Sequence, residues 1–398
     1  MRVAFLTPIE PLALSSFLPA ASEENIAIPT GGYGGYPVLA IIEARLARGL
    51  KTDIVTCVDS LPVPIARWKG DILNLWVVRA RRKHRLRDFY REETKLMIQA
   101  LSESSAEVVH AHWTYEYGLT ATIQKLLPAV VTVHDHSLRC LRLLGINFVT
   151  HFAMSLFVLR KTHVSSVVSS YIAPWVRFLS GNLPAVIPNI VTEKCCLLPS
   201  GVQTFACKRP HCIVCIGPFC RLKNQKNALE AFSILCNSYP HKSRLRLIGP
   251  GTEEGGIAEI WARRHNLHHN VDFCGVLPHH KVLHEVWNAR VVFHPSLEES
   301  FGMVPIEGIM ANCAVVLAEQ AEGSASLLAS MKGVFVVNGL SPAQMAQGLA
   351  DALARTEGPE FDCSVTQKDI LAKCEPNSIL GKYESLYKQA VTRFAKTQ

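Results

Sequence analysis

The sequence contains little that would place the protein in a membrane or outside the cell. No run approaches the roughly 20 apolar residues that span a bilayer, and polar residues interrupt the longest one, at 146–159. Residues 1–7 predict a first strand and are too short an apolar stretch for a signal peptide. We therefore expect a cytoplasmic protein, with any membrane contact peripheral and at the inner face of the membrane.

Ordered spacings of metal ligands are also missing. The chain has 13 cysteines, and Cys207, Cys212, Cys215 and Cys220 are spaced too irregularly for a structural zinc site. No H-E-x-x-H motif is present. We expect reduced, mostly buried cysteines, as in cytosolic proteins, and neither a bound metal nor a cofactor.

The composition is that of an ordinary globular protein with large buried sheets. Of the 398 residues, 48% are hydrophobic and 19% are charged, and this length predicts about two domains. The formal net charge of +8 fits an anionic ligand or a membrane surface better than dedicated nucleic-acid binding.

Apolar runs and amphipathic segments alternate along the chain. The first half predicts strands at 3–6, 53–57, 73–78, 108–112, 130–133 and 166–168, and helices at 38–48, 88–101 and 119–127. The second half predicts strands at 212–216, 244–248, 271–274, 290–293, 314–317 and 334–337, and helices at 224–238, 256–265 and 281–288. This alternation predicts an α/β protein with two doubly wound parallel sheets, which bind ligands at the carboxyl ends of their strands.

The predicted domain boundary lies at residues 192–210, which have no clear period and contain Pro, Gly and Cys. We expect a linker there, between a first domain at 1–191 and a second domain at 211–377. Residues 378–394 have apolar side chains at helical spacing. Two arrangements of this helix are open. It packs on the second domain, or the segment 378–398 joins the first domain.

The segment HPSLEESFGMVPIEG, residues 294–308, is the most informative in the chain. It places Glu299 and Glu307 in an E-x7-E pattern, between a predicted strand and a predicted helix. Free N–H groups and the helix dipole favour an anion at such a helix start, and phosphate is the usual occupant. Carboxylates on either side of a diphosphate suit a nucleotide sugar. The alternative is a pair of solvated carboxylates, because Glu is favoured near a helix N-terminus.

This segment resembles the E-x7-E motif of the family 4 retaining glycosyltransferases, and the resemblance covers nearly the whole chain. It implies the GT-B fold, in which two Rossmann-like, doubly wound domains face a central cleft and the terminal helix returns to the first domain. It also implies that Glu299 holds sugar hydroxyls, that Glu307 holds the ribose, and that N–H groups near Gly302 hold phosphate. The donor-binding residues implied here are Ser300, Phe301, Gly302, Met303, Val304 and Glu307.

Two segments of the first half carry the resemblance further. Residues 30–37 resemble the family's glycine-rich loop, which implies that Gly32 and Gly34 approach the donor phosphates or the acceptor. A glycine-rich lid without ligand contact is the alternative. His134, at the end of a predicted strand, matches the family's cleft histidine, which implies a catalytic role. His110 and His112 are equally compatible with a packed and with a functional role.

In the second half, residues 216–225 resemble the family's G-R-x4-K-N loop, which implies that Lys223 neutralises the donor diphosphate. Pro218 replaces the family's arginine, and Arg221 is a candidate substitute for it. The family's other donor-binding turns match Gly217, Gly251 and Val276. Cys313 and Val315 replace a glycine and a proline of the family pattern, and residues 322–326 lack the acidic residue that usually follows the glycines there. These departures bear on donor identity and on activity.

A basic run extends from Arg79 to Arg91. It is either a solvated face or a surface for anionic lipid head groups or a charged acceptor. No aromatic residues interleave with these cations in a way that would stack nucleic-acid bases.

The resemblance implies a hexosyltransferase without a metal requirement, which moves a sugar from a nucleoside-diphosphate sugar to an acceptor hydroxyl with retention. The acceptor is a glycan, a glycolipid or a small molecule, as in polysaccharide biosynthesis. Two alternatives stay open: a GT-B nucleotide-sugar epimerase and a catalytically weak binding or scaffold protein.

Overall fold

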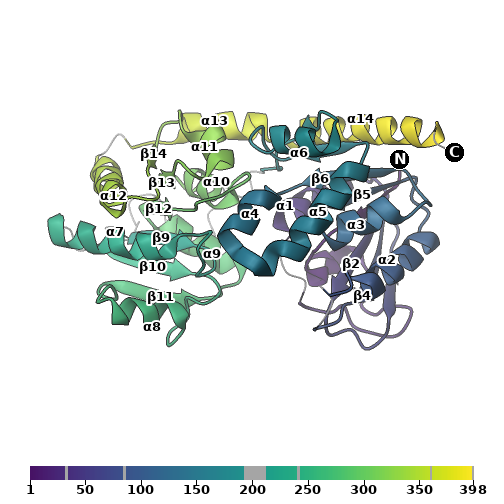
Figure 1. Ribbon diagram of the computed structural model, residues 1–398, viewed down its shortest axis with the longest axis horizontal. Coiled ribbons are helices and arrows are strands. Elements are labelled where there is room, and N and C mark those ends of the chain that lie inside the picture. The colour runs from purple at the N-terminus through teal and green to yellow at the C-terminus, as the bar shows by residue number, and fades with distance from the viewer. Residues whose placement is uncertain (32–34, 84–86, 192–211, 240–242, 359–360, 397–398) are drawn as a thin grey trace. The chain divides into compact units, whose positions relative to one another are not determined.

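The computed structural model describes residues 1–31, 35–83, 87–191, 212–239, 243–358 and 361–396. The chain forms two compact units (Figure 1). Unit 1 consists of Met1–Leu141, Gly145–Ile190 and Cys374–Gln398, and unit 2 consists of Arg142–Leu144 and Val191–Lys373. The linker expected at 192–210 lies outside the described residues.

Unit 1 is built on an eight-stranded sheet in the order β3-β4-β2-β1-β5-β6-β7-β8. Neighbouring strands are parallel apart from β3 and β4, which pair antiparallel. The antiparallel edge strand was not among the strands predicted from the sequence. The strands are β1 (Val3–Leu6), β2 (Thr52–Val58), β3 (Ile65–Lys69), β4 (Leu73–Arg79), β5 (Val108–His112), β6 (Ala129–Val133), β7 (Ser165–Val167) and β8 (Ala185–Val186).

Helices cover both faces of this sheet. Successive residues of a strand point to opposite faces, so Val3 and Phe5 of β1 join one core while Ala4 and Leu6 join another. The first core includes α1 and α14, and the second includes α2, α3 and α5. The helices of unit 1 are η1 (Pro11–Phe17), α1 (Tyr36–Ala47), α2 (Arg91–Glu103), α3 (Glu116–Ile123), α4 (Ser137–Leu144), η2 (Gly145–Phe148), α5 (Val149–Lys161), α6 (Ala173–Ser180) and α14 (Pro376–Ala395).

The helix α14 belongs to unit 1, although it follows unit 2 in the chain (yellow in Figure 1). Its buried side chains include Ile379, Tyr383 and Tyr387, which lie in the same core as Phe5. The carboxylate of Glu375 accepts hydrogen bonds from the backbone N–H groups of residues 377 and 378 and so caps the helix. The core of unit 1 is therefore assembled from two distant parts of the sequence.

The run from α4 to α5, Ser137–Lys161, is long and apolar enough to cross a membrane by length and composition, and an 18-residue window within it has a mean hydropathy of 1.5. The expectation that no segment reaches this level is therefore wrong. The run nevertheless connects β6 to β7, which are adjacent parallel strands, so it is the crossover that such a pair requires. Its Met154, Val158 and Leu159 are buried in unit 1.

Unit 2 is built on a six-stranded parallel sheet in the order β11-β10-β9-β12-β13-β14. Its strands are β9 (Cys212–Ile216), β10 (Arg244–Ile248), β11 (Val271–Gly275), β12 (Val291–His294), β13 (Ala314–Ala318) and β14 (Val334–Val337). Its helices are α7 (Gln225–Ser238), α8 (Ile257–Arg264), α9 (His279–Asn288), α10 (Met303–Met310), α11 (Glu322–Leu328), α12 (Pro342–Glu357) and α13 (Ser364–Lys373). Residues of α7 and α12 share one core with the sheet, and the predicted pair of doubly wound units is confirmed.

Candidate functional site

The two central strands of unit 2 define its binding position. The winding of the sheet reverses between β9 and β12, and doubly wound sheets bind ligands beyond the carboxyl ends of such a pair. Lys223 follows β9 and Glu299 follows β12, so both lie at this position. The N–H of Leu297 donates to the carbonyl oxygen of Leu222 at 2.8 Å, which ties the two loops together.

The loop between β12 and α10 is packed tightly against the start of α11. Gly302, the N-cap of α10, has a φ of +84°, and a Cβ there would lie 1.9 Å from the hydroxyl oxygen of Ser324. A Cβ on Gly323 would lie 2.2 Å from the carbonyl oxygen of Ser300. Only glycine fits these two positions, which fixes the backbone at the start of α10.

The side chains of this loop divide into two kinds. Ser300 and Phe301 are buried, so they could meet a donor only through their backbone groups. Met303 and Val304 are half-buried and form the first turn of α10, whose N–H groups have no acceptor within the helix. The predicted anion site at this helix start is therefore compatible with the geometry.

Lys223, Glu299 and His294 form one polar cluster. The ammonium of Lys223 lies 2.7 Å from Oε2 of Glu299, and His294 Nε2 lies 3.2 Å from the same oxygen. Burial alone would raise the pKa of Glu299, but the charge of Lys223 and the hydrogen bond from His294 hold that pKa well below its usual range. Burial lowers the pKa of His294, so a neutral ring donates its Nε2–H to a charged carboxylate.

The stem of Lys223 passes beside Gly217, where a Cβ would lie 3.0 Å from its Cγ. Burial would lower the pKa of Lys223, but Glu299 raises it, so the ammonium keeps its charge. The structure thus brings Lys223 and Glu299 into contact before any ligand is bound. Arg221 is exposed, and no ion pair of its side chain is found among the described residues.

A residue that sequence reasoning missed holds these loops together. Asn224, the N-cap of α7, has a φ of +56° and is buried. Its amide donates to the carbonyl oxygens of Pro295 at 3.0 Å and Gly339 at 2.7 Å. Its place in the K-N pair of the loop was the available signal, since asparagine tolerates the left-handed conformation.

Glu307 lies inside α10 with its side chain buried, and a second missed residue, His279, contacts it. His279 Nε2 is 3.0 Å from Glu307 Oε1, and this hydrogen bond raises the pKa of His279 against the effect of burial. His279 begins α9, directly after the loop that contains Val276. Val276 is 69% exposed, so its backbone and side chain are open to a ligand.

Gly251 marks another of the predicted donor-binding turns. Gly251 follows β10 with a φ of +81°, and its N–H donates to Glu253 at 2.9 Å.

The residues that depart from the family pattern lie elsewhere in unit 2. Cys313 is buried with its thiol 3.2 Å from the carbonyl oxygen of Val286, and Val315 is buried in β13. Both replacements are therefore core residues and not ligand contacts.

In unit 1, His110 has a packed role. It is buried, with Nδ1 2.9 Å from the hydroxyl of Tyr387 and Nε2 2.7 Å from Oγ1 of Thr132. These bonds link β5 and β6 to α14. Burial, with the nearby charge of Arg45 and the ring of His134, keeps the pKa of His110 well below its ordinary value.

His112 and His134 form a hydrogen-bonded pair. Nδ1 of His112 is 2.9 Å from Nε2 of His134, and burial lowers the pKa of both rings, that of His134 to about 3. The His134 ring stacks on Trp113, with 4.2 Å between centroids. His134 is half-buried, whereas His112 is buried. Because Nε2 of His134 is engaged, Nδ1 is the nitrogen left to meet a ligand.

The carboxylate of Asp135 follows His134 and accepts a hydrogen bond of 2.5 Å from the hydroxyl of Tyr115. Burial raises the pKa of Asp135 to about 6 although this hydrogen bond opposes the shift. In the described part of the chain, no group of three or more His, Cys, Asp or Glu side chains is arranged to hold a metal ion.

The glycine-rich loop is described only at its edges. The N–H of Gly31 donates to Glu10 at 3.1 Å, and a Cβ on Gly35 would lie 1.9 Å from the carbonyl oxygen of Pro8. The loop therefore packs against the segment that follows β1. The predicted contacts Gly32 and Gly34 lie outside the described residues.

The basic run from Arg79 to Arg91 is partly neutralised. Arg81 lies 2.7 Å from Asp88, 2.8 Å from Glu93 and 3.3 Å from Glu92. Hydrogen bonds to the first two carboxylates raise the pKa of Arg81. Residues 84–86 of the run lie outside the described part of the chain. Arg81 is thus an internal partner of three acids, and its charge is not available to an external ligand.

Unit 2 thus brings a lysine, two carboxylates and a helix start to the switch point of its doubly wound sheet, an arrangement that suits an anionic ligand. Residues 203–360 match the model of the family described as "Glycosyl transferases group 1". A search of curated proteins finds no match. This matched segment contains Lys223, Glu299 and Glu307.

Solved structures resemble the chain over nearly its whole length. Sucrose-phosphate synthase from Thermosynechococcus elongatus is 15% identical, with a TM-score of 0.74 over 98% of this chain and 99% of that one. A structure described as trehalose-6-phosphate from E. coli bound with UDP-2-fluoro glucose is 14% identical, with a TM-score of 0.70 over 98% and 99%. Anabaena Alr3699/HepE in complex with UDP is 15% identical, with a TM-score of 0.67 over 98% and 100%.

The chain therefore has the GT-B fold, and residues 203–360, which contain the Lys223–Glu299 pair, are similar to the group 1 glycosyl transferases.

Proposed function

We propose that this protein is a retaining hexosyltransferase of family 4, which moves a sugar from a nucleoside-diphosphate sugar to an acceptor hydroxyl. The observation that carries the proposal is the cluster of Lys223, Glu299 and His294 at the switch point of unit 2, beside the open start of α10. A fixed cation and free N–H groups at one place suit a diphosphate, and carboxylates suit the hydroxyls of its sugars.

In the proposed reaction, Lys223 stabilises the negative charge that develops on the departing diphosphate. For this step its ammonium turns from Glu299 toward the phosphate oxygens, and Glu299 then accepts from the donor-sugar hydroxyls. His294 keeps its Nε2–H on Glu299 and holds the carboxylate in place. Glu307, oriented by His279, accepts from the ribose hydroxyls. The positive charge comes from the chain itself, so the proposal involves no divalent metal.

Retention follows if the new bond forms on the face that the diphosphate leaves. The bond from the anomeric carbon to the phosphate oxygen breaks, and a bond to the acceptor oxygen replaces it. The proton of the acceptor hydroxyl passes to the departing phosphate. Glu299 stays hydrogen-bonded to His294 and accepts from the donor-sugar hydroxyls, which makes it a poor nucleophile and favours this route over a covalent intermediate.

For unit 1 we propose that His134 fixes the geometry of the reacting groups through its Nδ1. The acceptor is a glycan, a glycolipid or a small sugar, since one of the similar structures was determined with UDP and glucose. We place the reaction in the cytoplasm, because the irregular spacing of the 13 cysteines is that of reduced thiols.

The test is calorimetry with UDP, GDP and ADP, beginning with UDP because similar structures contain it. We expect at least one nucleotide to bind, and Lys223→Ala to weaken that binding about tenfold or more through loss of a charge-assisted contact. Lys226→Ala is the matched control, because Lys226 is an exposed cation in the first turn of α7, three residues after Lys223, and its ammonium lies over the ring of Trp261. No binding by any of the three nucleotides would contradict the proposal.

Product analysis separates transfer from the alternatives. With a bound nucleotide sugar and a panel of acceptors, a transferase forms a glycoside that keeps the anomeric configuration of the donor. A new nucleotide sugar formed from the donor alone would indicate an epimerase. Nucleotide binding without any turnover would indicate a binding protein.

A further inference from the structure

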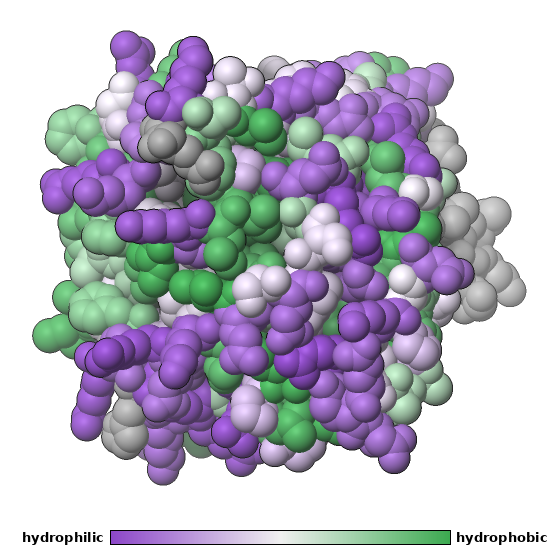
Figure 2. Space-filling view, turned by 90° about the vertical axis from the view of Figure 1, so that its right-hand side faces the viewer, coloured by the Kyte–Doolittle hydropathy of each residue, from purple (hydrophilic) through white to green (hydrophobic). Residues whose placement is uncertain are grey.

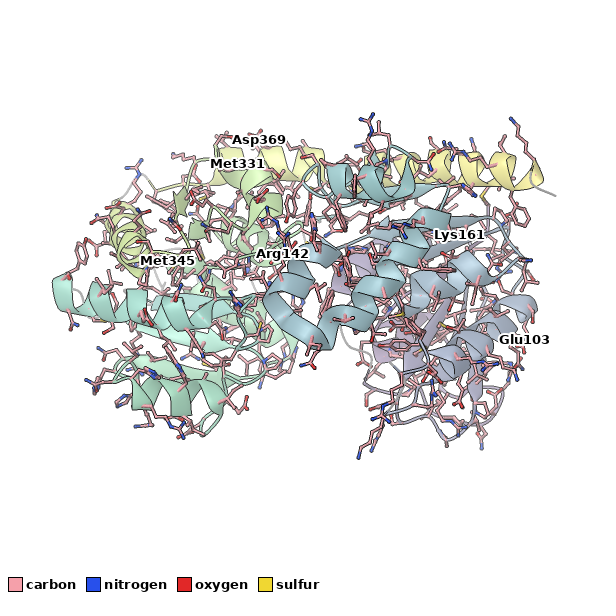
Figure 3. All side chains as sticks on the ribbon, viewed as in Figure 1. Glu103, Arg142, Lys161, Met331, Met345 and Asp369 are labelled. Atoms are coloured by element: carbon pink, nitrogen blue, oxygen red, sulfur yellow. The ribbon has the colours of Figure 1, made fainter. Side chains whose placement is uncertain are left out.

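A cavity of about 680 Å³ opens on unit 1 where α3, α5 and α14 meet. Its lining comes from the end of α3 and the segment after it, the end of α5, and the last turns of α14. Figure 3 labels Lys161, the last residue of α5, which is part of this lining. None of the residues assigned above to donor or acceptor is among the described residues that line it.

Large apolar side chains are exposed around this cavity. Ile123 is 41% exposed and Phe157 is 43% exposed, and both line it. A shallower hollow of about 350 Å³ shares Ile123 and adds Phe89, which is 48% exposed. The view of this end of unit 1 shows apolar side chains gathered among hydrophilic ones (Figure 2). Large apolar side chains exposed together in this way mark an interaction site.

The charges around the cavity are of one sign. Lys125, Lys161, Arg393 and Lys396 line it, and all four are exposed. Of the described residues that line it, none is acidic. Arg393 also donates to the backbone carbonyl oxygen of His163, so its side chain is held at the rim. The face therefore combines an apolar floor with a rim of cations.

We propose that this face, formed by α3, α5 and α14, docks the protein on an anionic lipid bilayer. A soluble anion would need the cations but not the exposed Ile123 and Phe157, whereas a bilayer surface offers phosphate groups beside acyl chains. The lipid phosphates contact the four cations, and the two apolar side chains enter the boundary between head groups and acyl chains. The basic run from Arg79 to Arg91 is not required, since Arg81 is engaged by its own acids.

The experiment is co-sedimentation of the full chain with vesicles, without nucleotide, so its result does not depend on the proposed transfer reaction. Vesicles of phosphatidylcholine alone are compared with vesicles that also contain phosphatidylglycerol. We expect binding to the anionic vesicles only. The triple variant Lys125→Gln, Lys161→Gln, Lys396→Gln should bind them about tenfold to a hundredfold more weakly, since each cation contributes near an anionic surface.

The matched control is Lys373→Gln, Lys382→Gln, Lys388→Gln, which makes the same change in net charge at exposed lysines outside the cavity. We expect this control to bind within about threefold of the parent, because none of its three lysines lines the cavity. Equal losses in the two triple variants would overturn the proposal in favour of a general charge effect. Absence of binding to anionic vesicles by the parent would also overturn it and would leave an acidic protein as the partner to seek.

A second pair of variants tests the apolar half of the face. Ile123→Ser with Phe157→Ser should reduce binding to anionic vesicles about tenfold or more. Phe178→Ser with Leu183→Ser is the control, because these residues are 80% and 76% exposed on unit 1 but lie outside the cavity. A loss of vesicle binding in this control but not in the test variant would overturn the proposed face. Thermal unfolding of each variant checks that its fold is retained.

Discussion

The polar clusters of the two units differ in the charge that their side chains carry at pH 7. In unit 1, burial lowers the pKa of His110, His112 and His134, so these rings are neutral at pH 7. In unit 2, mutual attraction lowers the pKa of Glu299 and raises that of Lys223, so both remain charged. One unit offers neutral hydrogen-bonding groups, and the other offers fixed charge.

This difference matches what each side of a group transfer needs. A departing diphosphate requires positive charge that is present before the reaction, which the Lys223 side supplies. An acceptor or a donor sugar is neutral, and a neutral ring such as His134 can orient it without attracting the phosphates. The contrast also predicts different responses of the two units to acid and to mutation.

The largest expected effect is the response to acid. A histidine with a lowered pKa in the folded state stabilises the unfolded state once pH falls below the unfolded pKa of about 6.5. At pH 5 the buried rings of His110 and His112 should each cost about 2 kcal/mol of stability relative to pH 7. Hydrogen exchange, corrected for its intrinsic pH dependence, should show β5 losing protection before β13, which contains no titratable side chain. Equal losses in both strands would contradict the comparison.

The next largest effect concerns His134. We expect His134→Ala to reduce transfer about a hundredfold or more, while nucleotide affinity changes by less than about twofold, because the residue acts on reaction geometry and not on the nucleotide. Transfer rate and calorimetry are the paired measurements. His163→Ala, at an exposed histidine of the same unit, is the control. A retained rate would make His134 a packing residue of the His112 pair.

Removal of Glu299 should destabilise unit 2. In Glu299→Ala the ammonium of Lys223, whose side chain is only 22% exposed in the parent, loses its hydrogen-bonded carboxylate, which should cost about 1–3 kcal/mol in urea unfolding. The double variant with Lys223→Met should lose less than the sum of the single losses, because the two side chains interact. Strict additivity would mean that the pair contributes nothing as a pair.

The smallest of these effects is at Glu307. Glu307→Ala should weaken nucleotide binding about tenfold through loss of hydrogen bonds to the ribose, with folding retained. Glu319→Ala is the control, since Glu319 is an exposed carboxylate of the same unit. Calorimetry with the nucleotide identified for the parent decides the outcome. Unchanged affinity would remove Glu307 from the site.

The sequence alone predicted the parts of the fold that rest on local patterns. Continuous apolar runs predicted buried strands such as Val3–Leu6 and Val108–His112, whose bounds agree with the structure. The edge strand β3 was missed because Arg67 and Lys69 interrupt its apolar pattern. The helices α4 and α5 were missed because polar residues break the apolar stretch that they share.

The contacts within the candidate site could not be predicted, because they join residues that are far apart in the chain. Lys223 and Glu299 are 76 positions apart, and His110 and Tyr387 are 277 apart. Motif resemblance indicated Lys223 and Glu299 as separate ligand contacts, but nothing in either motif indicated that they pair. His279 lies outside any recognised pattern, and His294 begins the segment 294–308 without an assigned role there. Only the fold places these rings beside Glu307 and Glu299.

The return of α14 to unit 1 has a consequence for biosynthesis. Tyr383 and Tyr387 fill the core that Phe5 begins, and they are translated only after all of unit 2. On the ribosome, unit 2 can finish folding first. Unit 1 is made earlier but stays incomplete until α14, which contacts α1 and β5, has been translated. A chaperone that shields apolar surface would find its longest-lived target there, and a stop codon ahead of Pro376 would leave that target permanently exposed.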